Sequence, residues 1–214
     1  MSVQQIGALD EAAPAGSQRF DVLNELGDCY SALGDLDRAK DCYRQAADLE
    51  PDRAAPYVGL GVAAIQLDRL DEAQIAFETA ARREPHCAEA YGGLAMIRQH
   101  RQDYPGAFDM HLKCLELDTD NLVALLGLFQ TSCQMGTFAK VIHYLEVYLD
   151  RHPGDTSVLF CLATLYAREG QLDSARESVL SVLALEPGKA EAEQLLREIQ
   201  KQLAEMKPQD ALSA

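Results

Sequence analysis

Residues 23–51 read LNELGDCYSALGDLDRAKDCYRQAADLEP, and the spacing of the leucine, glycine, alanine and proline in this stretch recurs along the chain. The pair Leu26-Gly27 has counterparts every 34 residues, at Leu60-Gly61, Leu94-Ala95, Leu128-Phe129 and Leu162-Ala163. Two more markers keep the same register: Ala39, Ala73, Ala107, Val141 and Ala175, and then Pro51, Pro85, Thr119, Pro153 and Pro187. A fixed period of this length indicates a repeat architecture, in which each repeat is one supersecondary unit.

The repeats divide the chain without insertion or deletion. If Phe20 begins the first, the five units are residues 20–53, 54–87, 88–121, 122–155 and 156–189. Within each unit, apolar residues fall at helical spacing in two blocks of about a dozen residues, which predicts two helices. Between the blocks, glycine suits the left-handed end of the first helix, and a short polar residue can cap the second. The candidates are Gly34, Gly136 and Gly170 for the turns, and Asp35, Asp103 and Thr137 for the caps.

The residues outside the five units are predicted to have simpler roles. Residues 190–206 show one more amphipathic helix, with charge on its outer side, which suits the polar cap that a repeat array needs at its end. Residues 1–19 are weakly patterned and are expected to be either poorly ordered or folded back as an N-terminal cap. Residues 207–214 are expected to form a frayed tail.

The repeat residues resemble the tetratricopeptide repeat (TPR) family, whose pattern is W-x2-L-G-x2-Y, then A-x3-F, then P, with a period of about 34 residues. The matching residues of the first unit are Leu23, Leu26, Gly27, Tyr30, Ala39, Tyr43, Ala46 and Pro51. Those of the second are Tyr57, Leu60, Gly61, Ala73, Phe77, Ala80 and Pro85. The resemblance extends over residues 20–189 and implies an all-α fold, a right-handed α-solenoid of stacked antiparallel helix pairs known as the TPR superhelix.

The charge of the chain argues against two classes of partner. It has 34 acidic and 19 basic residues among 214, a net charge of −15, with the acidity strongest in residues 1–53. Phosphate backbones and anionic membrane surfaces both require clustered Lys and Arg, so neither nucleic acid nor a membrane surface is expected as a partner.

The sequence predicts a cytoplasmic location for the protein. The first residues lack the basic start and apolar run of a signal peptide. The six cysteines form no CxxC pair and are scattered through helical patterns, which favours a reducing compartment. Residues 121–139 carry no charge and are long enough for a membrane span, but their second half is polar. A buried first helix of the fourth repeat explains this stretch better than a membrane span does.

No arrangement of residues suggests catalysis, a cofactor or a metal ion. Gly59-x-Gly61-x-x-Ala64 fits a dinucleotide fingerprint only on paper, because that motif needs a preceding strand. His111 and Cys114 are one helical turn apart, but a metal site needs three or four ligands, so core packing is the preferred interpretation. The prediction is therefore a protein that is not an enzyme and holds neither cofactor nor metal.

The resemblance implies that the first helix of each repeat lines a concave groove. The candidate peptide-binding residues on that face are Asn24, Asp28, Val58, Val62, Gln66, Glu89, Met96, Gln99, Leu126, Gln130, Phe160, Thr164 and Arg168. TPR co-chaperones use Lys, Arg and Asn in this groove to clamp the C-terminal carboxylates of heat-shock chaperones. Here those positions hold Asn24, Asp28, Gly59, Glu89 and Gly93, so no carboxylate clamp is expected.

Two functions remain open at this level. The first is a protein–protein interaction module, an adaptor or chaperone that binds an apolar, partly basic peptide segment of another protein in its groove. The groove glycines would then let a ligand backbone approach closely. The second is a self-assembling TPR scaffold that forms homo-oligomers through its repeat faces and array ends.

Overall fold

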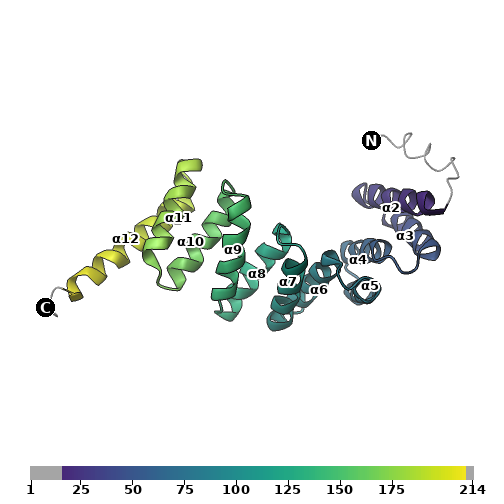
Figure 1. Cartoon of the computed structure of the whole chain (residues 1–214), viewed down its shortest axis with the longest axis horizontal. Helices are drawn as coiled ribbons and strands as arrows, with labels where there is room; N and C mark the ends of the chain where they lie inside the picture. Colours follow the sequence, from purple (N-terminus) through teal and green to yellow (C-terminus); the bar gives the residue numbers. More distant parts are fainter. Residues whose placement is uncertain (1–15, 211–214) are drawn as a thin grey trace. The chain divides into compact units, whose positions relative to one another are not determined.

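The structure is a computed structural model that describes residues 16–210, with side chains from residue 18 to residue 206. Over residues 16–210 the chain forms eleven helices and no strand, which confirms the all-α class (Figure 1). The helices are α2 (Gly16–Ala32), α3 (Leu36–Leu49), α4 (Ala55–Gln66), α5 (Leu70–Arg83), α6 (Ala88–His100), α7 (Tyr104–Leu117), α8 (Leu122–Met135), α9 (Ala139–Arg151), α10 (Thr156–Arg168), α11 (Leu172–Leu185) and α12 (Ala190–Asp210).

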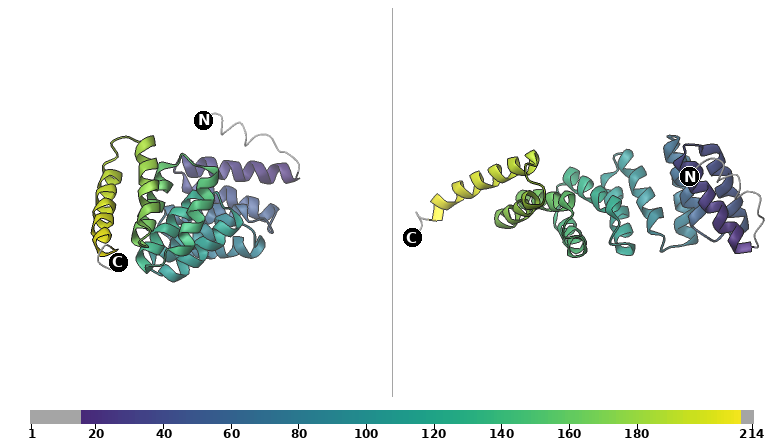
Figure 2. Two further views of the ribbon diagram at one scale, coloured as in Figure 1. Left: turned by 60° about the vertical axis from the view of Figure 1, so that its left-hand side comes forward. Right: turned by 90° about the horizontal axis from the view of Figure 1, so that it is seen from above.

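The chain divides into two compact units, residues 1–118 and residues 119–214. In the first unit, α2 packs on α3, α4 on α5 and α6 on α7, and the first helices α2, α4 and α6 also contact one another in turn. In the second unit, α8 packs on α9, α10 on α11, and α12 on α11. Helix hairpins stacked in sequence order, visible in each unit in Figure 2, make the fold an α-solenoid, as the repeat pattern predicts.

The turn inside each hairpin has the same backbone conformation in all five repeats. Gly34, Gly136 and Gly170 have φ values of 78°, 68° and 77°, which confirms the predicted left-handed helix ends. The equivalent residues of the second and third repeats are Asp68 and Gln102, with φ values of 57° and 61°. The left-handed residue therefore recurs every 34 residues even where it is not glycine, the residue that adopts this conformation without steric cost.

Two of the three predicted helix caps are present. The side chain of Asp35 accepts a hydrogen bond from the backbone N–H of Arg38 at 3.3 Å, and that of Asp103 accepts one from Gly106 at 3.1 Å. The prediction for Thr137 is wrong, because α9 begins later and its N-cap residue is Phe138, without a side-chain cap. The N–H of Thr137 instead bonds the carbonyl of Ser132, in the turn that ends α8.

Small residues of two consecutive first helices make room for an aromatic ring from the second helix that lies between them in the sequence. A Cβ atom added at Gly27 or at Gly59 would lie 2.4 Å from the ring of Tyr43. One added at Gly61 or at Gly93 would lie 2.7 or 2.4 Å from the ring of Phe77. Each ring is almost fully buried, so it acts as a wedge between consecutive first helices.

This packing corrects the expectation that the groove glycines leave space for a ligand backbone. At Gly59 and Gly93 the space of the missing side chain is taken by Tyr43 and Phe77. Gly92 differs, because a Cβ atom there would meet only the sulfur of Cys114, at an ordinary contact distance of 3.6 Å.

His111 occupies the position on α7 that corresponds to Tyr43 and Phe77, and it is only 1% exposed. Its Nε2 lies 3.4 Å from Oε1 of Gln99, while its Nδ1 is buried without a hydrogen-bond partner. Burial lowers the pKa of His111 to about 4, so the ring is neutral at pH 7. Burial also raises the pKa of the Cys114 thiol to about 12. Both side chains pack in the core, and no group of three or more potential metal ligands occurs among the residues described.

The uncharged stretch forms α8, a helix of 14 residues. The hydroxyl of Thr131 donates to the carbonyl of Gly127 at 2.9 Å, and that of Ser132 donates to the carbonyl of Phe129 at 2.7 Å. These bonds satisfy the two buried hydroxyls of α8. The helix is only partly buried, because Leu122 and Val123 are exposed. Over residues 16–210, no helix combines the length and the apolar character that crossing a membrane requires.

Helix α12 completes the core of the second unit. Its residues Ala192 and Ile199 are buried against a cluster that α10 and α11 supply, which includes Ala163 and Val179. From Glu191 to Glu205, the charged residues of α12 face solvent. The helix thus covers apolar surface on one side and presents a polar outer side, as an array end requires.

Candidate functional site

A hollow of about 640 Å³ in the first unit is formed at three successive first helices. Helix α2, helix α4 with the residue before it, and the segment that leads into α6 supply its walls, and Tyr43 reaches it from α3. The lining residues are Asp28, Ser31, Ala32, Tyr43, Ala54, Ala55, Val58, Gly59, Val62, Gln66, Glu84, His86, Cys87 and Glu89. Five of the predicted site residues are among them: Asp28, Val58, Val62, Gln66 and Glu89.

The apolar part of this hollow comes from α4. Val58 and Val62 are one helical turn apart and therefore lie on the same face of the helix. Val58 is half-buried and packs against two apolar clusters of the core. Val62 is 40% exposed and belongs to neither cluster, so the packing of the repeats leaves part of its side chain uncovered.

Hydrogen bonds between helices fix the polar side of the hollow. The hydroxyl of Tyr43 donates to Oδ1 of Asp28 at 2.7 Å, so the wedge that separates α2 from α4 also holds a carboxylate of the groove. Burial and this bond raise the pKa of Tyr43 well above its usual range. Nε2 of Gln66 donates to Oγ of Ser31 at 3.3 Å and links α4 to α2.

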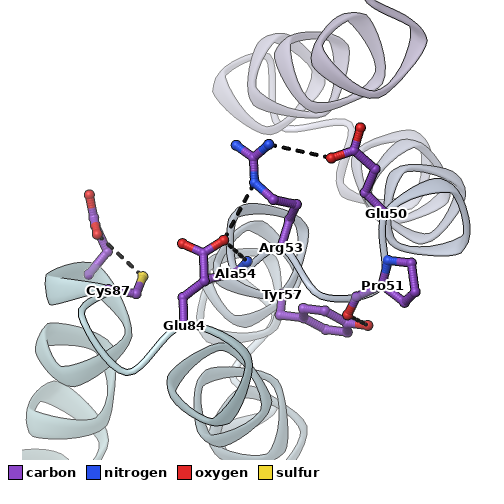
Figure 3. Close-up of polar contacts among 8 residues, drawn as sticks. Glu50, Pro51, Arg53, Ala54, Tyr57, Glu84 and Cys87 are labelled. Atoms are coloured by element: carbon purple, nitrogen blue, oxygen red, sulfur yellow. Dashed lines mark hydrogen bonds and ion pairs between the residues drawn. The ribbon is translucent and has the colours of Figure 1, made fainter. Parts of the chain in front are cut away.

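The connection between the second and third repeats also lines the hollow, through Glu84, His86 and Cys87. Figure 3 shows the polar contacts around Glu84. Oε1 of Glu84 accepts a hydrogen bond from the N–H of Ala54 at 3.0 Å and lies 3.4 Å from Nε of Arg53. Arg53 also pairs with Glu50 at 3.4 Å. The charge of Glu84 is therefore balanced by a neighbouring cation and used to fix the start of α4.

The thiol of Cys87 belongs to the same wall and is held in its protonated form. It donates to Oε2 of Glu89 at 3.4 Å (Figure 3). Burial, together with this bond to a carboxylate, raises the pKa of Cys87 to about 11. A thiol with a raised pKa is a weak nucleophile at neutral pH, because little of it is present as thiolate.

Three predicted residues of the first unit lie outside the hollow. Asn24 is half-buried, and its Oδ1 has no hydrogen-bond partner in the structure. Met96 is 44% exposed on α6. Gln99 contacts the buried ring of His111 rather than open space.

A smaller hollow of about 470 Å³ lies in the second unit, between α10 and α12. It is lined by the predicted residues Thr164 and Arg168, together with Ala167, Leu195, Glu198, Ile199 and Gln202. The guanidinium of Arg168 stacks over the ring of Phe138, 5.8 Å from its centre. The predicted residues Leu126, Gln130 and Phe160 do not line this hollow, and Phe160 packs against the core beneath the ammonium group of Lys189.

Reasoning from the sequence missed the residues that reach the first hollow from outside the first helices. Tyr43 projects from a second helix, and Glu84, His86 and Cys87 lie on the connection between repeats. One signal could have found Glu84: an acidic residue precedes the recurring proline at Glu50, Glu84 and Glu186. Such a recurring acid indicates a structural bond at each junction, and the hydroxyl of Thr156 indeed donates to Glu186 in the fifth repeat.

The turn geometry, the wedged rings and the capped array agree with one family model, tetratricopeptide repeat, which matches residues 30–97. The chain therefore contains tetratricopeptide repeats, matched over residues 30–97. Several solved structures resemble this chain over more residues than the family model matches. Their sequence identities are low, so the likeness shows the shared fold alone. Pseudomonas aeruginosa pilF is 19% identical, with a TM-score of 0.68 over 90% of this chain and 93% of its own.

Two further structures show the same fold. YrrB, described as a TPR protein with an unusual peptide-binding site, is 18% identical, with a TM-score of 0.64 over 89% of this chain and 100% of its own. The first TPR domain of Spaghetti, bound to the HSP90 peptide SRMEEVD, is 26% identical, with a TM-score of 0.52 over 56% of this chain and 95% of its own. No curated protein sequence matches the chain.

Proposed function

We propose that this TPR protein is a protein–protein interaction module that holds an apolar peptide segment of a partner in the hollow of its first unit. The observation that carries the proposal is Val62, whose side chain is 40% exposed within a hollow of about 640 Å³. That volume lies in the range of ligand sites in proteins, which combine an apolar lining with a few polar groups. Asp28, Ser31, Gln66, Glu84, His86 and Glu89 are among the polar groups here.

The charge of the hollow separates this proposal from recognition of an acidic chain end. The peptide bound by the Spaghetti domain, SRMEEVD, ends in acidic residues. The lining of the present hollow contains Asp28, Glu84 and Glu89 but no Lys or Arg. Carboxylates repel an acidic peptide, so we propose a partner without a carboxylate-rich terminus.

The proposal also covers the cellular role of the protein, catalysis and a contact in the second unit. We propose an adaptor or chaperone role in the cytoplasm, without catalysis, because the fold serves binding and the Cys87 thiol in the first hollow donates to Glu89 rather than to the neighbouring His86 and has a raised pKa. Thr164 and Arg168 form a second candidate contact in the second unit. The remaining predicted residues are proposed only as surface around the two hollows.

The test is recovery of partners from a native lysate with paired variants. Val62→Glu places a charge at the apolar base of the hollow and should remove most of the specific partners. Ile75→Glu is the matched control, because Ile75 is 64% exposed on α5 and does not line the hollow. Equal recovery with both variants would contradict a groove in the first unit, provided that circular dichroism shows both to be folded.

A self-assembling scaffold is the second candidate, favoured by apolar side chains outside the hollows. Leu180 and Leu185 on α11 are 50% and 54% exposed and line neither of the two hollows described above. If the scaffold is correct, light scattering should show a mass that rises with protein concentration, and Leu180→Glu or Leu185→Glu should reduce the rise. A monomer at every concentration would eliminate this candidate.

A further inference from the structure

Two carboxylates in the first hollow lack a cation, although a third is paired. Glu84 lies beside Arg53 and also caps the start of α4. Among the described residues, no Lys or Arg lies within ion-pair distance of Asp28 or Glu89, and each accepts only an uncharged donor, the Tyr43 hydroxyl or the Cys87 thiol. His86 is the sole basic side chain in the lining, and it has no ion-pair partner there. The hollow therefore keeps two negative charges that the protein itself does not balance.

The two charges stand at opposite ends of the apolar surface. Asp28 is on α2, Glu89 is in the first turn of α6, and Val58 and Val62 are on α4 between them. Packed helices are about 8–10 Å apart, so two steps from α2 to α6 measure about 16–20 Å. An extended peptide advances about 3.3 Å per residue and covers that length in about five or six residues.

We propose that the ligand is an extended segment with two basic side chains about five positions apart, which leave opposite faces of the segment, reach the two carboxylates through their long flexible stems and enclose an apolar stretch. This inference rests on the proposed function and states what the same hollow selects. One basic side chain pairs with Asp28, the other pairs with Glu89, and the apolar residues between them cover Val62. The negative hollow attracts such a segment and repels an acidic one, so charge gives selectivity while the apolar contact gives binding.

The test uses hexapeptides of defined charge, blocked at both ends, in an amide-resolved NMR titration of the full chain. KAVALK carries the proposed spacing, and KKAVAL has the same composition and charge with its lysines adjacent. QAVALQ and EAVALE are the neutral and acidic forms. We expect KAVALK to bind about tenfold more tightly than QAVALQ, KKAVAL to fall between them, and EAVALE not to bind, with the shifts centred on the amides of α4.

Variants assign the effect to the two carboxylates. Asp28→Asn and Glu89→Gln keep an oxygen that accepts the bonds from Tyr43 and Cys87, so the fold should persist. Each should weaken KAVALK about fivefold and leave QAVALQ unchanged. The controls Asp48→Asn and Glu78→Gln remove exposed carboxylates outside the hollow and should have no effect. The preference for KAVALK should also shrink when the salt concentration is raised about tenfold.

The outcomes separate this inference from the function on which it rests. If KAVALK and QAVALQ bind equally and Val62→Glu abolishes both, peptide binding stands and selection by charge is wrong. If KKAVAL binds as tightly as KAVALK, the spacing is wrong. If no peptide shifts the amides of the hollow, both the inference and the proposed groove are overturned.

Discussion

At the residue scale, one backbone conformation is imposed on side chains that do not favour it. Gln102 has a φ of 61° at the turn position where three other repeats have glycine. In this left-handed conformation a residue with a Cβ atom is destabilised by about 1 kcal/mol or more, whereas glycine is not. Gln102→Gly should therefore stabilise the protein by about 0.5–1 kcal/mol in urea denaturation.

The same substitution in an ordinary helix gives the control for this prediction. Gln45 is exposed within α3, where glycine lowers stability by about 1 kcal/mol relative to a good helix former. Gln45→Gly should thus shift the urea midpoint in the opposite direction from Gln102→Gly. A loss of stability in both variants would show that the turn is not strained by glutamine.

His111 makes stability depend on pH. Its pKa is lowered to about 4 by burial, whereas an unfolded chain has the ordinary value of 6.5. As the pH falls below 6.5, the histidine of the unfolded chain becomes protonated, whereas His111 of the folded protein stays neutral until about pH 4. Protonation therefore favours the unfolded chain, and stability is lost between about pH 6.5 and pH 4. The full loss from this group is about 3 kcal/mol.

The measurement for His111 compares urea denaturation at pH 7 and pH 4.5 for the natural protein and for His111→Phe. Phenylalanine is the residue of the preceding repeat at this position, so the core should tolerate the ring. The variant should lose less stability on acidification than the natural protein. Other carboxylates titrate in both proteins, so it is the difference between them that reports on His111, and equal losses would contradict the lowered pKa.

At the scale of helices, the wedge of Tyr43 fixes how closely α2 and α4 approach. Gly59→Ala adds a Cβ atom 2.4 Å from a buried ring, which must move or force the helices apart. The expected cost is about 1–3 kcal/mol in the free energy of unfolding, the usual range for overpacking. Thermal or urea denaturation measures it directly.

Gly92→Ala is the matched control for Gly59→Ala. The position is also inside a first helix, but the added Cβ atom would meet only the Cys114 sulfur at 3.6 Å. Alanine favours helix over glycine, so this variant should be stabilised by about 0.5–1 kcal/mol. If the two alanine variants behave alike, the ring at Gly59 is not the limiting contact.

At the scale of the whole molecule, each compact unit has its own core. The first contains the clusters around Phe20, Leu26 and Phe77, and the second contains the cluster that α12 completes. Because repeat proteins gain stability from neighbouring repeats, a fragment that retains its neighbours retains most of its packing. Residues 16–118 and residues 119–210 should each give a helical circular dichroism spectrum and a cooperative melt. A fragment that melts without a transition would show that its core depends on the rest of the chain.

The sequence predicts this fold well because its signals are local and repeated five times. The left-handed turn glycines, the acidic caps at Asp35 and Asp103, and the end helix all depend on residues close in the chain. The groove was harder to predict, because Tyr43 enters it from another helix through the space left by Gly59. A glycine pattern cannot distinguish room for a ligand from room for a ring of the same chain. The Thr137 cap failed for a smaller reason, since the first residue of a helix is poorly specified by local pattern.

The wedges also constrain how an array of this kind can lengthen or shorten over evolutionary time. Each ring is contributed by one repeat and received partly by the next, so Tyr43 needs Gly27 before it and Gly59 after it. In the first two repeats, duplication or loss of a whole 34-residue segment still places each ring between two glycines, because the donor and acceptor positions share one period. An indel of another length places a ring opposite a residue with a side chain. Changes in gene length in such a protein should therefore survive in whole periods, except in loops that carry neither partner.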